Sequence, residues 1–327
     1  MSKENVLEIR DLHSSFFTDS GVVRAVNGVD LVIPQGKIIG LVGESGCGKS
    51  MTAKSVMGLL RYPGRIESGS IRFMDKELVG LPDKELRKLC GNEMSMIFQE
   101  PMTSLNPVLR VGRQVEEAIL VHGKAEKRAE AKKLVLDMFE HVGIPEGEKR
   151  YSCYPHELSG GLRQRVMIAM AMVCRPRLLI ADEPTTALDV TIEAQILQLM
   201  QKECRESGMS ILLITHNLGV VAEICDFVYV MYAGRIVEEA DICTLFDHPA
   251  HPYTRGLLRA VSSLRSGGSV LDTIPGNVPN LLHLPDGCSF SPRCGCCTEE
   301  CGTMPELREI APGHRVRCCR GGEEAAV

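Results

Sequence analysis

One octapeptide constrains the fold of this chain more than any other segment. Residues 43–50 read Gly-Glu-Ser-Gly-Cys-Gly-Lys-Ser and match the phosphate-binding pattern G-x-x-x-x-G-K-[ST] at every fixed position. An apolar run over 38–42 precedes it and a predicted helix over 51–60 follows, which is the strand, loop and helix order that the pattern requires. Glycines let the backbone bend so that its N–H groups surround an anion. The segment therefore predicts a nucleotide phosphate site rather than an ordinary glycine-rich turn.

We expect the residues of this loop to share the binding of a triphosphate. Lys49 is expected to reach the terminal phosphates, and the Ser50 hydroxyl to ligate Mg²⁺. Backbone N–H groups supply further contacts, including that of Cys47, whose thiol needs no function of its own. The candidate nucleotide-binding residues of the loop and of the helix start are Gly43, Ser45, Gly46, Cys47, Gly48, Lys49, Ser50 and Met51.

Length and charge exclude several classes of protein. With 327 residues the chain is long enough for one large domain and an appendage, or for two domains. The formal net charge of −5 argues against a general nucleic-acid-binding protein. No apolar run reaches the length of a membrane span, and the first residues lack the apolar segment of a signal peptide. We therefore expect a cytosolic protein that docks onto another component.

The order of predicted elements indicates an α/β fold. Apolar residues at helix spacing dominate 101–175, which is predicted as a helical insertion, whereas strands and helices alternate on both sides of it. The predicted elements include a helix over 111–121, strands over 29–33 and 210–215, a turn over 18–21 around Asp19 and a hairpin at 233–234. Strands interleaved with helices indicate a largely parallel sheet. A linker rich in serine and glycine is expected at 262–269, between a domain over 1–262 and a cysteine-rich extension over 263–327.

Two further segments carry chemistry. The apolar run 178–181 ends in Asp182 and Glu183, so that a buried strand would deliver one carboxylate to magnesium and the next to the attacking water. Acidic residues often end strands, so this run alone is weak evidence. Residues 158–161 read Leu-Ser-Gly-Gly at a predicted helix start, where Ser159 and exposed N–H groups would form a second anion site. A helix N-cap followed by flexible glycines would explain the Ser-Gly-Gly part equally well.

Taken in order, these three motifs resemble those of the ATPase subunit of an ATP-binding cassette (ABC) transporter. The resemblance spans about 6–262 and implies a P-loop cassette with a mixed sheet core, an antiparallel β subdomain and a helical insertion. In this family the signature of one cassette completes the nucleotide site of another, so a second cassette subunit is implied, identical or related. The resemblance also implies two transmembrane permease subunits and an extracellular solute-binding protein, and no nucleic-acid partner.

The same resemblance gives roles to residues outside the phosphate loop. It implies that Glu183 activates the attacking water, that His216 positions the γ-phosphate, and that Gln99 senses magnesium and water. It implies that the cofactors are ATP and Mg²⁺, with magnesium held by Ser50, Gln99 and Asp182. The remaining nucleotide contacts would come from Ser159, Gly160, Gly161 and Asp189, and from Phe16, or else Phe17, stacked on adenine.

Finer motifs resemble the ATPases of bacterial and archaeal oligopeptide and dipeptide importers, a group that also serves nickel. The segments that carry this likeness are 101–107, 163–171, 182–191 and 251–254. The run Val-Met-Ile-Ala-Met-Ala resembles the D-type ATPase, the first of two that such importers usually encode, which favours a heterodimer over a homodimer. The likeness implies a peripheral subunit at the cytoplasmic face of the membrane. Peptide and nickel both stay open as the solute, and the cysteine tail favours peptide.

Cysteines are distributed unevenly along the chain. Of the 14, seven lie within 288–319, and a late cluster in a reducing compartment suggests a metal site rather than a disulfide framework. The tail resembles the C-terminal extension of the peptide importers, whose four cysteines bind an iron–sulfur cluster, and this likeness implies the ligands Cys288, Cys294, Cys301 and Cys318. Four thiolates suit a [4Fe–4S] cluster and tetrahedral zinc alike. Cys319 is an alternative to Cys318, and Cys296, Cys297 and Cys319 depart from the family pattern.

Overall fold

The structure is a computed structural model that describes residues 5–99, 104–185, 189–265 and 274–321. The chain divides into two compact units. Unit 1 consists of Met1–Val6, Ile33–Lys37 and Gly80–Leu212. Unit 2 consists of Leu7–Val32, Ile38–Val79 and Leu213–Val327.

Unit 2 contains an antiparallel sheet with the strand order β2-β1-β4-β5. Its strands are β1 (Asn5–Thr18), β2 (Gly21–Pro34), β4 (Gly64–Phe73) and β5 (Lys76–Glu77). The turn predicted around Asp19 connects the first two strands. β1 and β4 pair from Leu7 opposite Phe73 to Phe16 opposite Gly64, which places Leu7 and Phe73 in the core.

A second sheet in unit 2 mixes parallel and antiparallel strands. β3 (Ile38–Val42) is buried at every position and pairs in parallel with β9 (Phe227–Tyr232). The chain then turns through Ala233 and Gly234, both at positive φ, into antiparallel β10 (Arg235–Asp241). β10 pairs with β12 (His314–Val316), and β12 with β11 (Arg308–Ala311). The C-terminal extension therefore adds two strands to this sheet.

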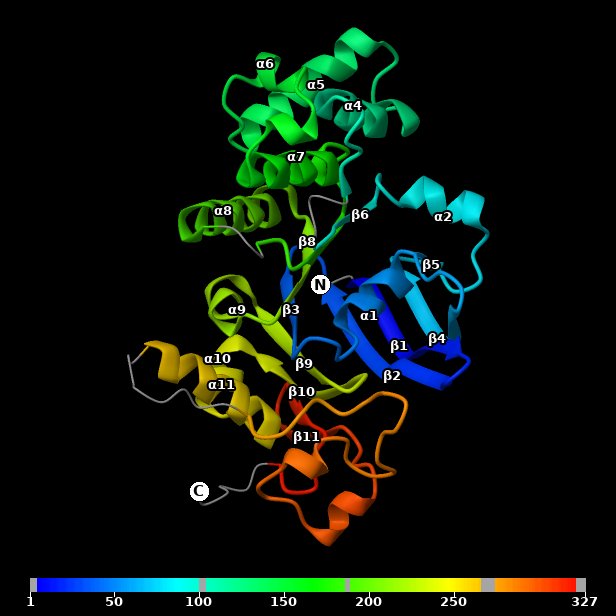
Figure 1. Cartoon of the computed structure of the whole chain (residues 1–327), viewed down its shortest axis with the longest axis vertical. Coiled ribbons are helices and arrows are strands. Elements are labelled where there is room, and N and C mark those ends of the chain that lie inside the picture. The colour runs from blue at the N-terminus through cyan, green and yellow to red at the C-terminus, as the bar shows by residue number, and fades with distance from the viewer. Residues whose placement is uncertain (1–4, 100–103, 186–188, 266–273, 322–327) are drawn as a thin grey trace. The chain divides into compact units, whose positions relative to one another are not determined.

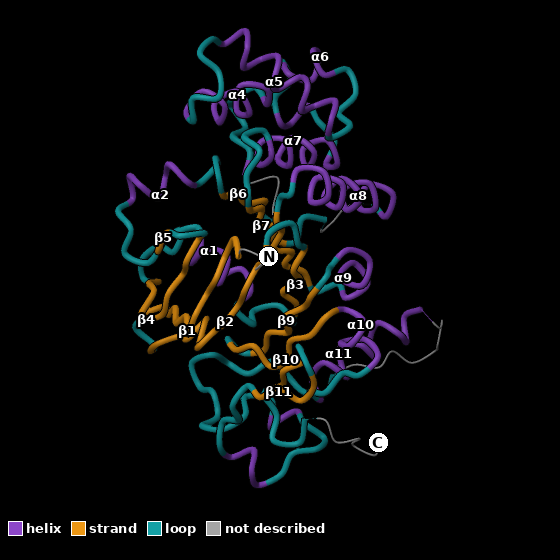
Figure 2. The backbone as a smooth tube through the Cα atoms, turned by 180° about the vertical axis from the view of Figure 1, so that it is seen from behind, coloured by secondary structure: helices purple, strands orange, loops and turns teal. Residues whose placement is uncertain are grey.

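The helices of unit 2 follow its strands closely. α1 (Lys49–Val56) begins directly after the phosphate loop. α9 (Leu218–Ile224), α10 (Ile242–Asp247) and α11 (Pro252–Arg265) lie together beside β9 and β10 (Figures 1 and 2). β8 (Ser210–Thr215) is wholly buried and contributes three residues to each unit. Short 3₁₀ turns at Ser291–Arg293 and Glu299–Gly302 occur in the extension.

Unit 1 combines a pair of parallel strands with a group of helices. β6 (Met94–Ile97) and β7 (Leu178–Asp182) are buried and parallel. Between them in sequence lie α4 (Val111–Val121), α5 (Arg128–His141), α6 (Gly147–Tyr151) and α7 (Gly160–Met172), which gather in one group (Figure 1). α2 (Asp83–Leu89) precedes β6, and α8 (Val190–Ser207) follows β7.

The predicted α/β class is confirmed, with the antiparallel sheet and the helical insertion that the resemblance implied. The mixed sheet that the resemblance implied is confirmed in unit 2, where β3 and β9 are parallel and the hairpin after β9 and the two strands of the extension run antiparallel. Among the described residues, no helix combines the length and the apolar character needed to cross a membrane.

Candidate nucleotide site and cysteine pocket

The phosphate loop lies between β3 and α1, and two of its glycines are needed for conformational reasons. Gly43 has a φ of 156° and Gly48 a φ of 111°, which side chains rarely adopt. A Cβ on Gly43 would lie 2.2 Å from the Met231 carbonyl oxygen, and one on Gly48 would lie 2.2 Å from the Ala25 carbonyl oxygen. Only glycine fits either position without a backbone shift. The predicted loop is therefore a defined backbone structure, packed against other segments of unit 2.

Lys49 is held inside the loop by the loop's own backbone. Its Nζ atom donates to the Gly43 carbonyl oxygen at 2.7 Å and to the Glu44 carbonyl oxygen at 2.9 Å. The residue is only 5% exposed. Gly48 is the N-cap of α1 and accepts the Thr52 N–H at 2.9 Å. A buried ammonium group beside a helix N-terminus suits an anionic ligand.

The remaining loop residues differ in exposure. Ser45 and Gly46 form the exposed tip, and Ser50 and Met51 are half-buried in the first turn of α1. Cys47 is fully buried, and burial raises the pKa of its thiol even though Lys49 acts against this rise. Its side chain is therefore uncharged and packed in the interior. This agrees with the expectation that only the Cys47 N–H would bind a phosphate.

His216 follows β8 directly and is exposed. Thr215 Oγ1 accepts the Asn217 N–H at 3.0 Å, and the Asn217 side chain accepts the Gly219 N–H at 2.9 Å. Asn217 thereby caps α9. These two hydrogen bonds restrain the backbone on both sides of His216, and therefore the position of its Cα atom.

Both candidates for adenine stacking are half-buried on β1. The Phe16 ring packs against Gly64, where an added Cβ would lie 2.6 Å from it. The Phe17 ring carries the Arg65 guanidinium 4.0 Å from its centroid. A cation already covers one face of Phe17, and the choice between the two rings stays a prediction.

In unit 1 the fold brings Gln99 and Glu183 together, although 84 positions separate them in sequence. Gln99 Nε2 donates to Glu183 Oε2 at 2.9 Å. Glu183 has a φ of 47°, in the left-handed region, and directly follows β7, whose last residue Asp182 is 4% exposed. Backbone strain of this kind collects at functional positions. The Gln99 amide therefore restrains the direction of the predicted catalytic carboxylate.

The signature segment forms the start of α7, also in unit 1. Leu158 is buried, and Ser159 is the N-cap, with its side chain accepting the Leu162 N–H at 3.4 Å. Ser159 and Gly160 are exposed, and an added Cβ on Gly160 would meet nothing within 4 Å. The first residues of this 13-residue helix therefore leave its N-terminus accessible. At half-buried Gly161 an added Cβ would lie 3.7 Å from the Ile192 side chain.

Several predicted segments fall partly outside the described residues. Asp189 is the exposed N-cap of α8, but Ala187 and Leu188, which precede it, lie outside. Residues 100–103 after Gln99 and the linker residues 266–269 also lie outside. The roles assigned to these segments stay predictions.

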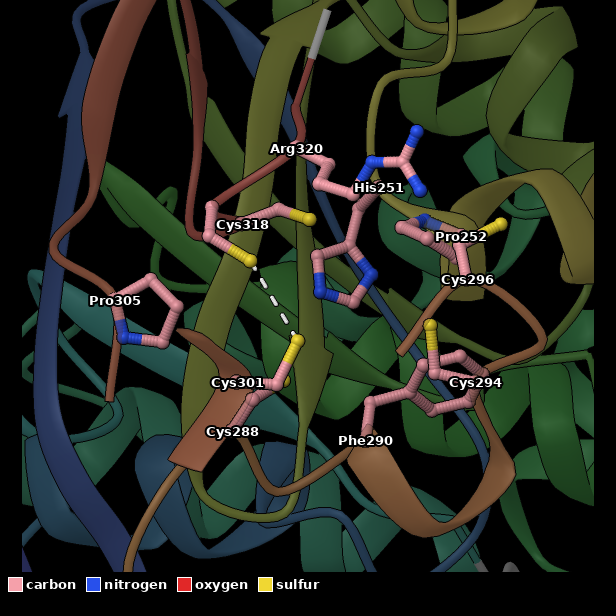
Figure 3. Close-up of a pocket in the computed structure, with 11 residues that line it drawn as sticks. His251, Pro252, Cys288, Phe290, Cys294, Cys296, Cys301, Pro305, Cys318 and Arg320 are labelled. Atoms are coloured by element: carbon pink, nitrogen blue, oxygen red, sulfur yellow. Dashed lines mark hydrogen bonds between the residues drawn. The ribbon is translucent and has the colours of Figure 1, made fainter. Parts of the chain in front are cut away.

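The four predicted cluster ligands line one pocket in unit 2 (Figure 3). Cys288, Cys294, Cys301 and Cys318 share it with Cys296 and Cys319. All 14 cysteines are free thiols, and Cys301 Sγ lies 3.5 Å from Cys319 Sγ. In the part of the chain that the structure describes, no three side chains of His, Cys, Asp or Glu are arranged to hold a metal ion. The fold therefore gathers the predicted residues without placing them in a coordination geometry.

Burial controls the protonation of most thiols in the pocket. It raises the pKa of Cys294 and of Cys318 to about 11, and it also raises the pKa of Cys288. Cys301 differs: burial acts to raise its pKa, but hydrogen bonds, first of all from the Thr298 N–H, lower it. Cys301 is thus the most readily ionised of the four predicted ligands.

His251 is a residue of this pocket that sequence reasoning did not single out. It is 1% exposed, and its Nδ1 atom accepts the Tyr253 N–H at 3.0 Å, so its ring proton lies on Nε2. Nε2 has no hydrogen-bond partner among the described residues, and the ring points among the cysteines (Figure 3). Burial lowers the pKa of His251 to about 4, so the imidazole is neutral. In the sequence its only signal is that it lies in the segment 251–254, which resembles the peptide importer ATPases.

Two family models match the chain. One, described as ABC transporter, matches residues 26–186, and the other, described as Oligopeptide/dipeptide transporter, C-terminal region, matches residues 237–301. The oligopeptide transport ATP-binding protein OppD of Salmonella typhimurium is 52% identical over 314 residues, which cover 96% of this chain and 93% of that protein. A putative peptide import ATP-binding protein of Brucella ovis is 50% identical over 339 aligned residues, which cover 100% of both.

Solved structures resemble the chain as well. The dimeric structure of MJ0796, a bacterial ABC transporter cassette, superposes with a TM-score of 0.66 and 26% identity over 72% of this chain and 98% of that one. A dimeric post-hydrolysis state of the same cassette, bound to ADP and Pi, also superposes with a TM-score of 0.66, at 25% identity over the same shares of both chains.

Proposed function

The chain belongs to the ABC transporter family, in the group that carries the oligopeptide and dipeptide transporter C-terminal region, and on this premise we propose that it is the ATP-hydrolysing motor subunit of a peptide importer. One observation carries the proposal: an intact phosphate loop and the C-terminal region of oligopeptide and dipeptide transporters occur in the same chain. The relatives named for oligopeptide transport and peptide import match it over nearly its whole length.

In this proposal the phosphate loop binds the nucleotide, and the residues around it bind magnesium and activate the attacking water. Lys49 and the loop N–H groups bind the phosphates, and His216 positions the γ-phosphate. Ser50, Gln99 and Asp182 offer the oxygen donors that magnesium prefers, and bound magnesium would neutralise phosphate charge. Glu183 orients and deprotonates the attacking water, and its hydrogen bond from Gln99 supports this role because it restrains the carboxylate.

A second cassette subunit is part of the proposal. Ser159, Gly160, Gly161 and Asp189 would contact the nucleotide of that partner, a sister ATPase in preference to an identical chain. The exposed N-terminus of α7 supports this, because its N–H groups are available to a phosphate from outside. The dimeric cassettes among the similar structures support it too. Closure of the two cassettes would move the permease subunits, to which the chain docks at the cytoplasmic face of the membrane.

The test uses vesicles that contain the chain, its sister ATPase, the permease subunits and the solute-binding protein. Glu183→Gln should bind ATP with unchanged affinity, whereas hydrolysis falls by about 10²- to 10⁴-fold because the base is lost. Peptide uptake should cease with it. Normal turnover in this variant would remove Glu183 from the role. ATP hydrolysis that does not depend on the membrane subunits would show that the importer proposal is wrong. Uptake of nickel in place of peptide would contradict only the proposed solute.

We also propose that the cysteine pocket binds a metal centre, a [4Fe–4S] cluster or else zinc. The proposed ligands are Cys288, Cys294, Cys301 and either Cys318 or Cys319. Six thiols line the same pocket, and as thiolates they would suit either group. The Nε2–H of neutral His251, which has no hydrogen-bond partner among the described residues, would donate a hydrogen bond to a ligand sulfur rather than bind the metal. When bound, the group would tie together segments of the extension that have few buried apolar residues of their own.

Metal analysis of the protein purified without oxygen tests this proposal. Iron with acid-labile sulfide would identify the cluster, and zinc alone would identify the alternative. Protein that contains neither iron nor zinc would contradict the proposal. Exchange of both Cys288 and Cys294 for serine should remove the metal and lower the thermal stability of the extension. Cys243→Ser is the matched control, because this thiol is exposed on α10 and does not line the pocket. Unchanged metal content in the double variant would refute the ligand assignment.

A further inference from the structure

A residue of the C-terminal extension contacts the phosphate loop directly. Arg293 Nη1 donates to Glu44 Oε2 at 2.7 Å, and Nη2 donates to Glu44 Oε1 at 3.0 Å. Glu44 is the first variable residue of the loop, and Arg293 lies in the 3₁₀ turn between Cys288 and Cys294. We propose that Arg293 is a positioning residue for the phosphate loop, so that affinity for ATP depends on the C-terminal extension. This inference rests on the proposed function and deepens it.

The arginine is itself held rigidly. Its side chain is 4% exposed, and Nε donates to the Pro275 carbonyl oxygen at 2.9 Å. The Ile274 carbonyl oxygen and the Tyr232 hydroxyl accept the remaining N–H groups, at 3.3 Å and 3.4 Å. All five N–H groups of the guanidinium therefore have acceptors, and two of them bind Glu44 as a fork. The hydrogen bonds to Glu44 raise the pKa of Arg293, so it stays charged.

A second contact holds the backbone of the same loop residue. The Glu44 N–H donates to the Tyr253 hydroxyl at 2.8 Å. Tyr253 is fully buried on α11, and its ring packs against Tyr232, with 4.6 Å between centroids, and against Phe290, with 5.5 Å. Phe290 also lines the cysteine pocket. Glu44 is thus restrained at its backbone and at its side chain by groups that lie far from it in sequence.

The residue that Arg293 and Tyr253 restrain is in direct contact with the phosphate-binding lysine. The Glu44 carbonyl oxygen accepts a hydrogen bond from Lys49 Nζ at 2.9 Å. A shift of the Glu44 peptide would therefore move the ammonium group that is proposed to bind the terminal phosphates. Because substrate-binding groups must be held closely to their productive positions, loss of this support weakens binding of ATP more than it alters a step after binding.

The experiment measures ATP binding by the full chain in complex with its sister ATPase and membrane subunits. Equilibrium binding of a fluorescent ATP analogue with Mg²⁺ gives Kd, and hydrolysis gives KM and kcat. Arg293→Gln should raise Kd and KM about tenfold, the worth of one charged hydrogen-bonded contact, with kcat at saturation almost unchanged. Arg293→Lys should recover only part of the affinity, because lysine keeps the charge but lacks the fork.

Two controls separate positioning from mere structural support. Arg315→Gln removes another Arg–Glu pair of the extension, that with Glu239 at 2.6 Å, which does not involve the phosphate loop, and should leave Kd unchanged. Glu44→Gln should weaken binding as Arg293→Gln does, and the double variant should bind no worse than either single variant, because both remove one contact. Thermal unfolding of each variant verifies that it is folded.

Three outcomes would overturn the inference while leaving the proposed function intact. They are an Arg293→Gln variant that binds ATP as well as the wild-type chain, a fully additive double variant, and an Arg315→Gln variant that loses as much affinity. A wild-type complex that failed to bind ATP would instead overturn the proposed function, and this inference with it.

Discussion

The phosphate loop and the cysteine pocket both belong to unit 2, but they are specified over very different lengths of chain. The loop consists of residues 43–50, and its shape follows from glycine conformations and two close backbone contacts. The residues that line the pocket run from His251 to Arg320. Pairing of β12 with β10 and side-chain contacts between distant segments hold the pocket's walls. The function of a local motif can therefore be predicted from its sequence. For a pocket built from distant segments, the sequence indicates only which kinds of residue are present and not how they are arranged.

The largest effect is expected where the local motif is broken. Gly48→Ala places a Cβ against the Ala25 carbonyl oxygen, so the loop must move, and Kd for ATP should rise about a hundredfold or more. Equilibrium binding of an ATP analogue measures this. Gly123→Ala is the matched control, because Gly123 also has positive φ but an added Cβ there meets nothing within 4 Å. Equal affinity in both variants would mean that the loop is less locally determined than we infer.

A smaller effect is expected where a distant contact is removed from the extension. His314 Nε2 lies 2.8 Å from Glu238 Oε1, and Glu238 is fully buried. His314→Ala leaves a buried carboxylate with one partner fewer, and the free energy of unfolding should fall by about 2 kcal/mol. Urea unfolding measures this loss of free energy, and hydrogen exchange of the β11 and β12 amides shows whether it is located in the extension.

The matched control is an exposed pair on α8. Lys202 Nζ lies 4.0 Å from Glu206 Oε2, and both side chains are more than half exposed. Lys202→Ala should lower the free energy of unfolding by less than about 0.5 kcal/mol. Similar losses in the two variants would contradict the view that β12 depends on its buried partners.

The smallest effect is a pH dependence of the same contact. Burial acts to raise the pKa of Glu238, but hydrogen bonds from His314 and from the N–H groups of Ala250 and His251 lower it below its ordinary value of 4.5. Because the folded value lies below the unfolded one, ionised Glu238 stabilises the fold above pH 4.5, and this contribution is lost as pH falls through the folded pKa.

Acid unfolding of the wild-type chain and of Glu238→Gln measures this contribution. Below pH 4.5 the free energy of unfolding of the wild-type chain should fall faster with decreasing pH than that of the variant, by at most about 1.4 kcal/mol per pH unit. Parallel pH profiles would show that Glu238 does not contribute to stability through its charge.

Secondary structure was predictable where periodicity is strong. The predicted helix over 111–121 and strand over 210–215 agree with α4 and β8. The strand predicted over 29–33 is part of the 14-residue β2, whose first four residues are exposed or half-buried and show no alternation of buried and exposed positions. The helix predicted over 51–60 begins two residues earlier, because the loop turns into α1 at Gly48, and it ends before Gly58, which has positive φ.

The extension was the least predictable region. β11 and β12 have four and three residues, too few for a periodic pattern, and they exist because β10 offers an edge for pairing. The contact between Arg293 and Glu44 joins positions 249 apart, and no spacing rule connects them.

The sequence alone determined the phosphate loop, the signature at a helix start and the crowding of thiols near the C-terminus. Each of these depends on neighbouring residues, through backbone conformation, helix capping or composition. The tertiary structure alone decided that Gln99 holds Glu183, that His251 faces the cysteines and that Arg293 supports the phosphate loop. Such contacts join distant segments, and only the packing of the whole chain determines which side chains meet.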